Sequence, residues 1–528
     1  MAERLSPGVY IEEVNTGPRP IEGVGTSMAA FVGFAASGPI NQPILVTSWD
    51  QYVQTFGGVQ ENGIRNGFLE GSYLGYSLYG YFNNGGRRCY VVRLPHMGNG
   101  EGGDKAAAHA GKILEKQIPT RASKAIPSLT FHPKGDPQSD ISIEITPPTL
   151  EDAGEGAFNL RVRMDDVEEI FENLIPGKPV KGAKGRAVTE TLQTSKLVTV
   201  VLEEKANATL AERAPELGTF MLKANTSLEL AQVQPSTFIG NVDDRSGLEG
   251  LEVLEDVTMV AVPDLMAMYQ RGLIDKDGVK AVQLALINHC ERMHDRMAII
   301  DPLPDLKPQA VKKWREKESN FDSKFAALYY PWIKVADANG KPVAVPPSAF
   351  MAGIWSRSDA ERGVHKAPAN EIVRGALGPV YEVTTNEQDT LNPIGINCIR
   401  SFTNRGVRVW GARTLSSDAQ WRYINVRRLF NYVQKSMFYG TQWVVFEPNN
   451  IDLWERVKRD ITAFLLGVWR DGALFGKTQQ EAFRIQVDEE NNPEESRDLG
   501  LLNVNIALSP VKPAEFVVLK FSQKMQSE

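Results

Sequence analysis

A glycine-rich segment late in the chain ends in the Gly-Lys-Thr triplet of a phosphate-binding loop. It reads Gly472-Ala-Leu-Phe-Gly476-Lys477-Thr478, with three residues between the glycines. A working loop has four residues there, follows a strand and opens a helix, so that successive backbone N–H groups surround a phosphate. Residues 451–469 before it have helical periodicity instead, which is typical of a helix end and turn. A phosphate-binding α/β enzyme is therefore the less favoured alternative, which tight ATP binding dependent on Lys477 would revive.

Two other groups of residues are of types that bind metals or transfer protons. His289 and His294 lie five apart on a predicted helix, whereas two ligands on one helix face need a spacing of three or four. We expect them on a surface or half-buried helix. Asp301 and Asp305 follow a predicted strand, where α/β enzymes place their sites, but no nucleophile or metal cluster accompanies them, so we interpret them as turn residues. The sequence thus predicts no catalytic residue, no metal, no cofactor and no enzyme.

Composition excludes further classes of function. The 58 Lys and Arg residues are outnumbered by 65 Asp and Glu, giving a net charge of -7 and no basic field for nucleic acid. Cys89, Cys290 and Cys398 are far apart, which indicates neither a disulfide framework nor a zinc site. The N-terminus lacks the apolar stretch of a signal peptide, and no run of about 18 apolar residues is present to span a membrane. We expect assembly in the cytoplasm, without membrane insertion.

Strand-like and helix-like segments alternate at both ends of the chain. From 256 to 335 three strand-like runs enclose two expected helices, at 278–294 and 308–318. The first hundred residues add two strand-like runs around an aromatic helix candidate, at 28–34, 88–94 and 71–82. Strand and helix in turn predict an α/β fold with α+β elements, in which helices flank a largely parallel sheet. This α/β body, of one or two subdomains, would comprise residues 26–98 and 234–508.

The segment between the two parts of the body has another character. Residues 99–233 contain short strand-like pieces separated by Gly, Pro and charge clusters, which predicts an inserted β-rich domain. The glycine-rich stretch 98–104 lacks phosphate-loop spacing, so we interpret it as the junction into this domain. Near the C-terminus we expect two long helices separated by a strand and followed by two more strands, at 418–439, 451–469, 442–448, 482–490 and 501–510.

Both chain ends carry short apolar segments. Residues 515–521 are apolar on both strand faces except at Lys520, and residues 8–14 are similar. An unpaired strand of this kind must be covered. Turn-prone linkers adjoin both, at 17–23 and 509–514, which suits strands that add to the sheet of a neighbouring molecule. The alternative, favoured on general grounds, is that both are edge strands of the protein's own sheet.

The chain resembles the contractile tail sheath proteins of phages, pyocin-like particles and extracellular contractile injection systems. SPGVYIEEV and YFNNGGRRCYVVRL resemble the family's N-terminal signature, while APAN, WGARTLS and the near-miss phosphate loop belong to its C-terminal blocks. Phrases of this length are too specific to recur by chance. The resemblance covers roughly 300 residues at the two ends of the chain. It does not extend convincingly over 99–233, which agrees with an insertion.

The resemblance implies a structural subunit that polymerises as stacked rings of six around an inner tube and contracts to drive the tube through a target envelope. Terminal arms would then pair with neighbouring subunits, reversing the general preference. The N-terminal arm would be Val9, Tyr10, Ile11, Glu12, Glu13 and Val14, and the C-terminal arm Glu515, Phe516, Val517, Val518, Leu519, Lys520 and Phe521. Residues 1–25 and 509–528 are thus arms with linkers, and 99–233 would face outward.

Further partners follow from the same resemblance. An acidic surface of the inner tube protein would face Arg456, Lys458 and Arg459 on the predicted 451–469 helix, and baseplate and terminal cap proteins would close the polymer. The particle, a phage tail or tail-like machine, would assemble in the bacterial cytoplasm and be released. A subunit that only caps or initiates the polymer remains an alternative, since such a relative could retain both arms.

Overall fold

The computed structural model describes residues 20–59, 65–95, 116–121, 127–134, 141–150, 152–164, 167–177, 184–202, 209–222, 233–337 and 339–520. The chain forms two compact units. The sheet unit comprises residues 27–357 and 368–417. The terminal unit comprises the rest, of which residues 20–26, 358–367 and 418–520 are described. The chain therefore passes between the units four times.

An eight-stranded sheet is the centre of the sheet unit. Its order is β2-β5-β1-β14-β15-β16-β20-β21, parallel from β5 to β20 and antiparallel at the two edge strands. The strands are β1 (Ala29–Gly33), β2 (Ile44–Val46), β5 (Cys89–Arg93), β14 (Met259–Ala261), β15 (Met297–Ile300), β16 (Ala326–Tyr330), β20 (Ile396–Phe402) and β21 (Gly406–Val409). Every residue of β1, β14, β15 and β16 is buried, as in a parallel sheet covered on both faces. The predicted α/β class is confirmed.

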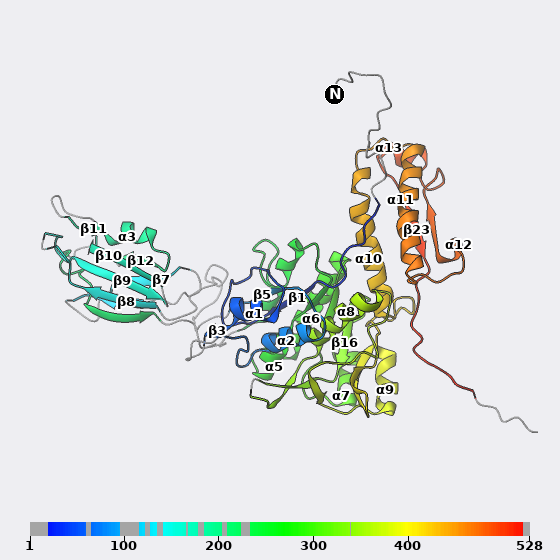
Figure 1. The fold of residues 1–528 in the computed structure, drawn as a ribbon, viewed down its shortest axis with the longest axis horizontal. Coiled ribbons are helices and arrows are strands. Elements are labelled where there is room, and N and C mark those ends of the chain that lie inside the picture. The colour runs from blue at the N-terminus through cyan, green and yellow to red at the C-terminus, as the bar shows by residue number, and fades with distance from the viewer. Residues whose placement is uncertain are drawn as a thin grey trace, which may run out of the picture. The chain divides into compact units, whose positions relative to one another are not determined.

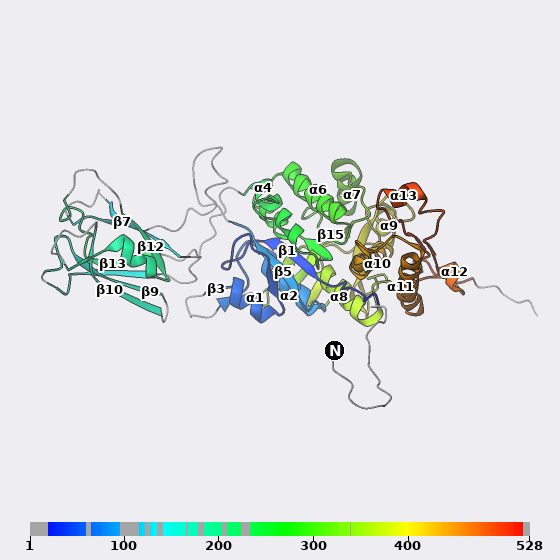
Figure 2. The ribbon, with the colours of Figure 1, turned by 90° about the horizontal axis from the view of Figure 1, so that it is seen from above.

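Helices cover both faces of this sheet. Figure 2 shows α4 and α6 on one side of β1 and β5, with α1, α2 and α8 on the other. The helices are α1 (Trp49–Phe56), α2 (Leu74–Asn83), α4 (Pro235–Ile239), α5 (Asp264–Gln270), α6 (Lys276–Met293), α7 (Pro308–Lys313), α8 (Ser348–Arg362) and α9 (Thr385–Leu391). The helix expected at 308–318 is α-helical to Lys313 and continues as a π-helix over Trp314–Ser319.

The strand expected near 325–335 is two strands of different sheets. β17 (Ile333–Ala336) leaves the large sheet and pairs with β18 (Pro342–Val345) and β19 (Ala376–Pro379). Pro331 separates β17 from β16, and a proline has no N–H to donate to a ladder. A further small pair joins β3 (Gly58–Val59) to β4 (Arg65–Asn66).

The described parts of 116–222 are rich in strands. A five-stranded sheet has the order β11-β10-β9-β8-β13, and a three-stranded sheet the order β12-β7-β6. The elements are β6 (Lys116–Pro119), β7 (Pro127–Pro133), β8 (Ile141–Thr146), β9 (Phe158–Met164), β10 (Val167–Ile175), β11 (Arg186–Ala187), α3 (Val188–Thr191), β12 (Val198–Leu202) and β13 (Gly218–Leu222). Alternate residues Ile141, Ile143 and Ile145 enter a core built within this region. Its role as an outward-facing inserted domain remains a prediction.

Two long helices and a small sheet form the terminal unit (Figure 1). The elements are α10 (Ile424–Gly440), α11 (Ile451–Arg470), α12 (Gln479–Ala482), β22 (Phe483–Gln486), α13 (Glu494–Asp498) and β23 (Asn505–Leu508). Leu429 and Val433 of α10 share one core with Leu453 and Val457 of α11 and with Phe483. In the described part of the chain, no helix is long and apolar enough to cross a membrane.

The strand predicted at 442–448 is wrong. The segment contains a short 3-10 helix, Gln442–Val444, and Phe446 has a left-handed backbone with φ +68°. Periodicity favoured a strand because four apolar residues lie in a row, but the segment has to connect α10 to α11 and finds no partner strand. Asn450 then begins α11 by accepting a hydrogen bond from Leu453 N at 2.9 Å, the usual role of an N-cap.

Candidate assembly site

A two-stranded sheet in the terminal unit has the properties of a strand acceptor. β22 and β23 pair antiparallel, with Phe483 opposite Leu508 and Ile485 opposite Ile506. These four side chains belong to the core of the unit or pack against it, whereas Arg484 on the opposite face is exposed. The sheet is therefore amphipathic, so added strands would bury apolar side chains on one face.

Both strands of this sheet have an open edge. Ser509 N donates to Ala482 O at 2.9 Å, which continues the ladder and fixes its phase. Because hydrogen-bonded pairs alternate in an antiparallel ladder, Ile485 on β22 and Ile506 on β23 direct their N–H and C=O groups away from the partner strand. Among the described residues no third strand pairs with either edge. The sheet therefore offers two sets of backbone groups for added strands.

The predicted C-terminal arm is exposed in this structure. Phe516, Val517, Val518 and Leu519 have 72–77% of their surface exposed and belong to no strand, and Lys520 is also exposed. Glu515 is half-buried and accepts a hydrogen bond from the Tyr423 hydroxyl at 3.0 Å. Phe521 lies outside the described residues. Four consecutive apolar side chains in water indicate a segment that is covered by something else.

The N-terminal arm, Val9 to Val14, lies outside the described residues. The last part of the linker that follows it packs against α10. Ile21 is buried there, and Val24 N donates to Ser436 Oγ at 3.1 Å. At Gly23 an added Cβ would lie 2.2 Å from the Tyr432 hydroxyl. The linker between 20 and 26 is thus a packed segment, and the glycine there allows close approach to α10.

The three predicted tube-facing residues do not share one face of α11. Arg456 lies over the Trp443 ring at 4.5 Å and 3.9 Å from Glu447, while Arg459 Nε contacts Asp460 Oδ1 at 3.4 Å. Both are exposed, whereas Lys458 is half-buried. Helix geometry places Arg456 and Arg459 about 60° apart and Lys458 about 160° from Arg456. The structure therefore brings only Arg456 and Arg459 together.

The glycine-rich segment 472–478 ends a helix, as predicted. It follows α11, Gly472 has φ +80°, and Lys477 N donates to Glu481 Oε2 at 2.7 Å. The helix after it, α12, has only four residues. Since no strand precedes this loop and its own glutamate occupies the Lys477 amide, the segment does not form a phosphate cradle.

The histidine pair gives no metal site either. His289 has no exposed surface and its ring lies between Arg296 at 3.3 Å and Arg292 at 3.4 Å. Burial, with the two arginines, lowers its pKa to about 3, so the ring is neutral. The prediction of a surface or half-buried position is wrong for His289, because a buried arginine cluster is not visible in periodicity. Among the described residues no three Cys, His, Asp or Glu are grouped for a metal.

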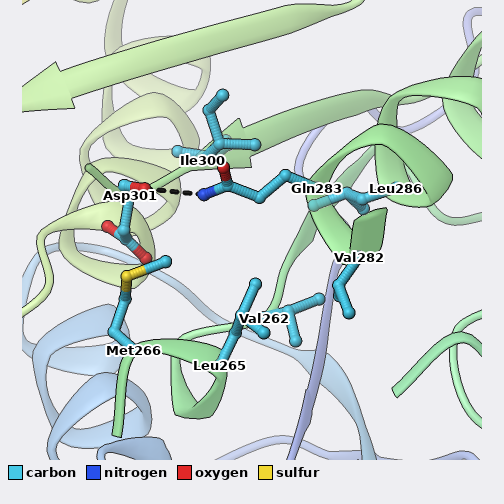
Figure 3. Close-up of a pocket in the computed structure, with 9 residues that line it drawn as sticks. Val262, Leu265, Met266, Val282, Gln283, Leu286, Ile300 and Asp301 are labelled. Atoms are coloured by element: carbon cyan, nitrogen blue, oxygen red, sulfur yellow. Dashed lines mark hydrogen bonds between the residues drawn. The ribbon is translucent and has the colours of Figure 1, made fainter. Parts of the chain in front are cut away.

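Asp301 is a buried helix-capping residue rather than a plain turn residue. Its carboxylate accepts hydrogen bonds from Ser348 N at 2.8 Å and Ser348 Oγ at 2.6 Å, at the start of α8. Figure 3 shows it beside Gln283, whose amide donates to the Asp301 backbone oxygen. Both residues line a cavity of about 10 Å³. Burial raises the pKa of Asp301 to about 7. Asp305, with φ +56°, is exposed in the turn that follows.

Replacing Asp301 by Asn is expected to reduce the pH dependence of stability. Between pH 4 and 7 the folded state holds a proton on Asp301 that the unfolded chain, with a pKa near 3.9, has released, so the free energy of unfolding falls as pH rises through this window. An asparagine can accept from Ser348 N and donate to Ser348 Oγ without titrating. From pH 5 to 7.5 the decrease should be about 2 kcal/mol smaller in the variant, by urea unfolding. Equal decreases in both proteins would contradict this assignment.

Two models of one protein family match consecutive parts of the chain. Residues 249–415 match the phage tail sheath protein central domain, and residues 416–524 match the phage tail sheath C-terminal domain. A prophage major tail sheath protein of Pseudomonas aeruginosa is 27% identical over 294 residues, which are 54% of this chain and 72% of that protein.

Solved structures share the fold over nearly the whole chain. The sheath of the extracellular contractile injection system PVC, in its contracted state, aligns with a TM-score of 0.57, 23% identity and 99% of each chain covered. A chain of the baseplate of the anti-feeding prophage aligns with a TM-score of 0.55, 23% identity, and 99% of this chain and 100% of that chain covered. The aligned length includes the described parts of 116–222, where sequence resemblance was weak.

Proposed function

The chain belongs to the tail sheath protein family of contractile phage tails and injection systems, and on this premise we propose that it forms stacked six-membered rings around an inner tube and contracts to drive the tube through a target envelope. Its relatives are structural proteins, so it is a structural sheath subunit and not an enzyme. The particle assembles in the bacterial cytoplasm and is released as a phage tail or tail-like machine. Baseplate and cap proteins close the polymer.

The observation that carries this proposal is the match between exposed arm and open sheet. The terminal unit has a two-stranded sheet whose two edges pair with no other strand of the described chain, and an apolar segment with 72–77% exposed side chains. Two edges accept two strands, which equals the number of arms, Val9–Val14 and Glu515–Phe521. Arms that add to β22 and β23 of neighbouring subunits supply the coverage that both features lack.

The free energy of arm pairing allows a network of subunits joined by their arms to persist while the subunits move. Each backbone hydrogen bond adds about 0.5–1.5 kcal/mol net, and burial of apolar arm residues adds roughly 25 cal/mol per Å². A strand of several residues per arm, repeated over every subunit, therefore holds the polymer together through contraction. The two compact units move as nearly rigid bodies, the region 99–233 faces outward, and the energy of the stroke is stored during assembly, so no nucleotide is required.

Electron microscopy of the purified chain tests the proposal against its closest alternative. Long striated tubes support a polymer-forming sheath subunit. Discrete rings or monomers at all concentrations would instead indicate a subunit that caps or initiates the polymer, a role suggested by the fold shared with a baseplate chain.

Contacts to the inner tube are proposed for α11. Reversing the charges of Arg456 and Arg459 to Glu should weaken sheath association with purified tube protein about tenfold at low salt, because both side chains are exposed on one face. Reversing Lys458, which is half-buried on another face, should have the smaller effect and serves as the comparison. Co-sedimentation over a salt series measures the change. Unchanged co-assembly of the Arg456 and Arg459 variant would remove α11 from the tube interface.

A further inference from the structure

The first half of α10 contacts the roots of both arms, which are Thr26 at the inner end of the N-terminal linker and residues 511–515 before the C-terminal arm. Its N-cap, Tyr423, and two of its residues, Asn425 and Arg428, bind segments that are far apart in sequence. Asn425 and Arg428 are 2% and 4% exposed. All the contacts lie within the terminal unit. Buried polar side chains of this kind fix geometry, because a buried group that loses its partner carries a desolvation cost.

The N-terminal root is held by a buried ion pair. Arg428 donates to Asp359 through two nitrogens, at 2.8 and 2.6 Å, and the Thr26 hydroxyl donates to the same carboxylate at 2.6 Å. Arg428 also donates to the Thr26 carbonyl at 2.9 Å. The two charged side chains are 4% and 5% exposed. Thr26 is thus clamped through its side chain and its backbone, immediately after the docked segment 20–25.

The C-terminal root is held by two neutral donors on the same helix. The Asn425 amide donates to His365 O at 2.7 Å and to Val511 O at 3.1 Å. Two residues earlier, the hydroxyl of the N-cap Tyr423 donates to Glu515. After Glu515 the chain carries the four exposed apolar residues of the arm. The free part of this arm therefore begins within one residue of its last contact with α10.

We propose that α10 is a shared anchor for both arms: Arg428 with Asp359 holds the inner end of the docked linker 20–26 that leads to the N-terminal arm, and Asn425 with Tyr423 fixes where the C-terminal arm leaves the helix. This inference rests on the proposed function, in which the arms pair with neighbouring subunits. A fixed root raises the effective concentration of an arm at its acceptor edge and lowers the entropy lost on pairing. One helix then sets the separation of the two departure points, and with it the spacing of the neighbours.

The test uses variants that remove one hydroxyl and keep the size and shape of the side chain. Thr26→Val keeps the branched shape but removes the hydroxyl donor to Asp359, and Thr26→Ser, which keeps the hydroxyl, is its control. Tyr423→Phe removes the donor to Glu515, and Tyr439→Phe, the same change at the other end of α10, is its control. Full-length proteins are compared by the subunit concentration at half-maximal tube formation, by melting temperature and by hydrogen exchange of the monomer.

Each test variant should raise the concentration for tube formation about three- to tenfold, while its control stays within twofold of the native chain. In the monomer, Thr26→Val should speed hydrogen exchange in residues 20–26 and Tyr423→Phe in residues 512–519, with melting temperatures little changed. A purely structural role would lower the melting temperature without this local pattern. If Thr26→Val unfolds the chain, Tyr423→Phe decides, since its ring and packing remain.

Deletion of residues 515–528 separates this inference from the function on which it rests. If the deletion abolishes tubes but Thr26→Val and Tyr423→Phe assemble as the native chain does, the anchor is wrong and the arms are not. If the chain without residues 515–528 forms normal tubes, the proposed function itself is wrong.

Discussion

A chain that ends at Ala514 is expected to fold normally and to form no tubes. Among the described residues, the core of the terminal unit includes none beyond Leu508, and Phe516 to Leu519 are exposed, so their loss removes little folding energy. Under the proposed function, what is lost is the strand that each subunit would add to its neighbour. Circular dichroism and melting temperature should match the full chain to within about 2 °C, while sedimentation and electron microscopy show only unassembled subunits. Removal of residues 1–14 should have the same result.

An edge variant provides the complementary control for this deletion. Ile485→Pro removes an N–H that points away from β23, so it blocks an incoming strand on β22 without removing a bond of the native ladder. Arg484→Pro, one residue earlier, removes an inward N–H and should destabilise the unit itself. Tubes of normal length from the chain ending at Ala514 would place the assembly function elsewhere in the molecule.

Replacing Asp264 by Ala should destabilise the sheet unit by about 3–5 kcal/mol, the largest single effect we expect on stability. The carboxylate has no exposed surface and accepts from Phe34 N at 2.6 Å, Leu74 N at 3.1 Å, Ser72 Oγ at 2.9 Å and Tyr73 N. It therefore links the end of β1 to the start of α2. Alanine leaves two backbone donors, Phe34 N and Tyr73 N, without an acceptor, each costing about 1–3 kcal/mol, while Leu74 N keeps its hydrogen bond to Ser72 Oγ at 3.2 Å.

At the pH of the proposed measurement, Asp264→Ala removes a charged acceptor. Burial raises it to about 6, although the four donors lower it, so the carboxylate is ionised at pH 7.5. Urea unfolding at pH 7.5 should show the loss for Asp264→Ala and a smaller loss for Ser72→Ala, which removes only one of the donors. A change below about 1 kcal/mol for Asp264→Ala would show that the network does not stabilise the unit.

Local patterns in the sequence predicted most of the regular elements. The helices expected at 278–294 and 451–469 are present as Lys276–Met293 and Ile451–Arg470, because their apolar residues recur at helical spacing and capping residues precede them. The helix expected from Asp418 begins six residues later, at Ile424. Segment 442–448 failed because apolar content alone does not distinguish a strand from a connection that packs on a helix.

Long-range contacts were beyond the reach of such patterns. Asp264 binds backbone groups about 190 and 230 residues earlier in the chain, and nothing in its local sequence indicates this. The clamp of Thr26 by Asp359 and Arg428 joins three distant segments in the same way. The apolar run at 516–519 could be identified in the sequence because it lacks a polar face, and that property is local; its role as an arm stays a prediction. The acceptor proposed for it required the structure, since the edges of β22 and β23 depend on which of the described strands pair.

The most direct test of the account is a cryo-electron microscopy map of tubes assembled from the full chain, at a resolution that traces individual strands. We expect β22 and β23 to be the inner strands of a four-stranded sheet, with residues 9–14 and 515–521 of neighbouring subunits as the outer strands. A map in which both arms pair with the sheet of their own subunit, or in which the two edges stay unpaired inside the polymer, would contradict it.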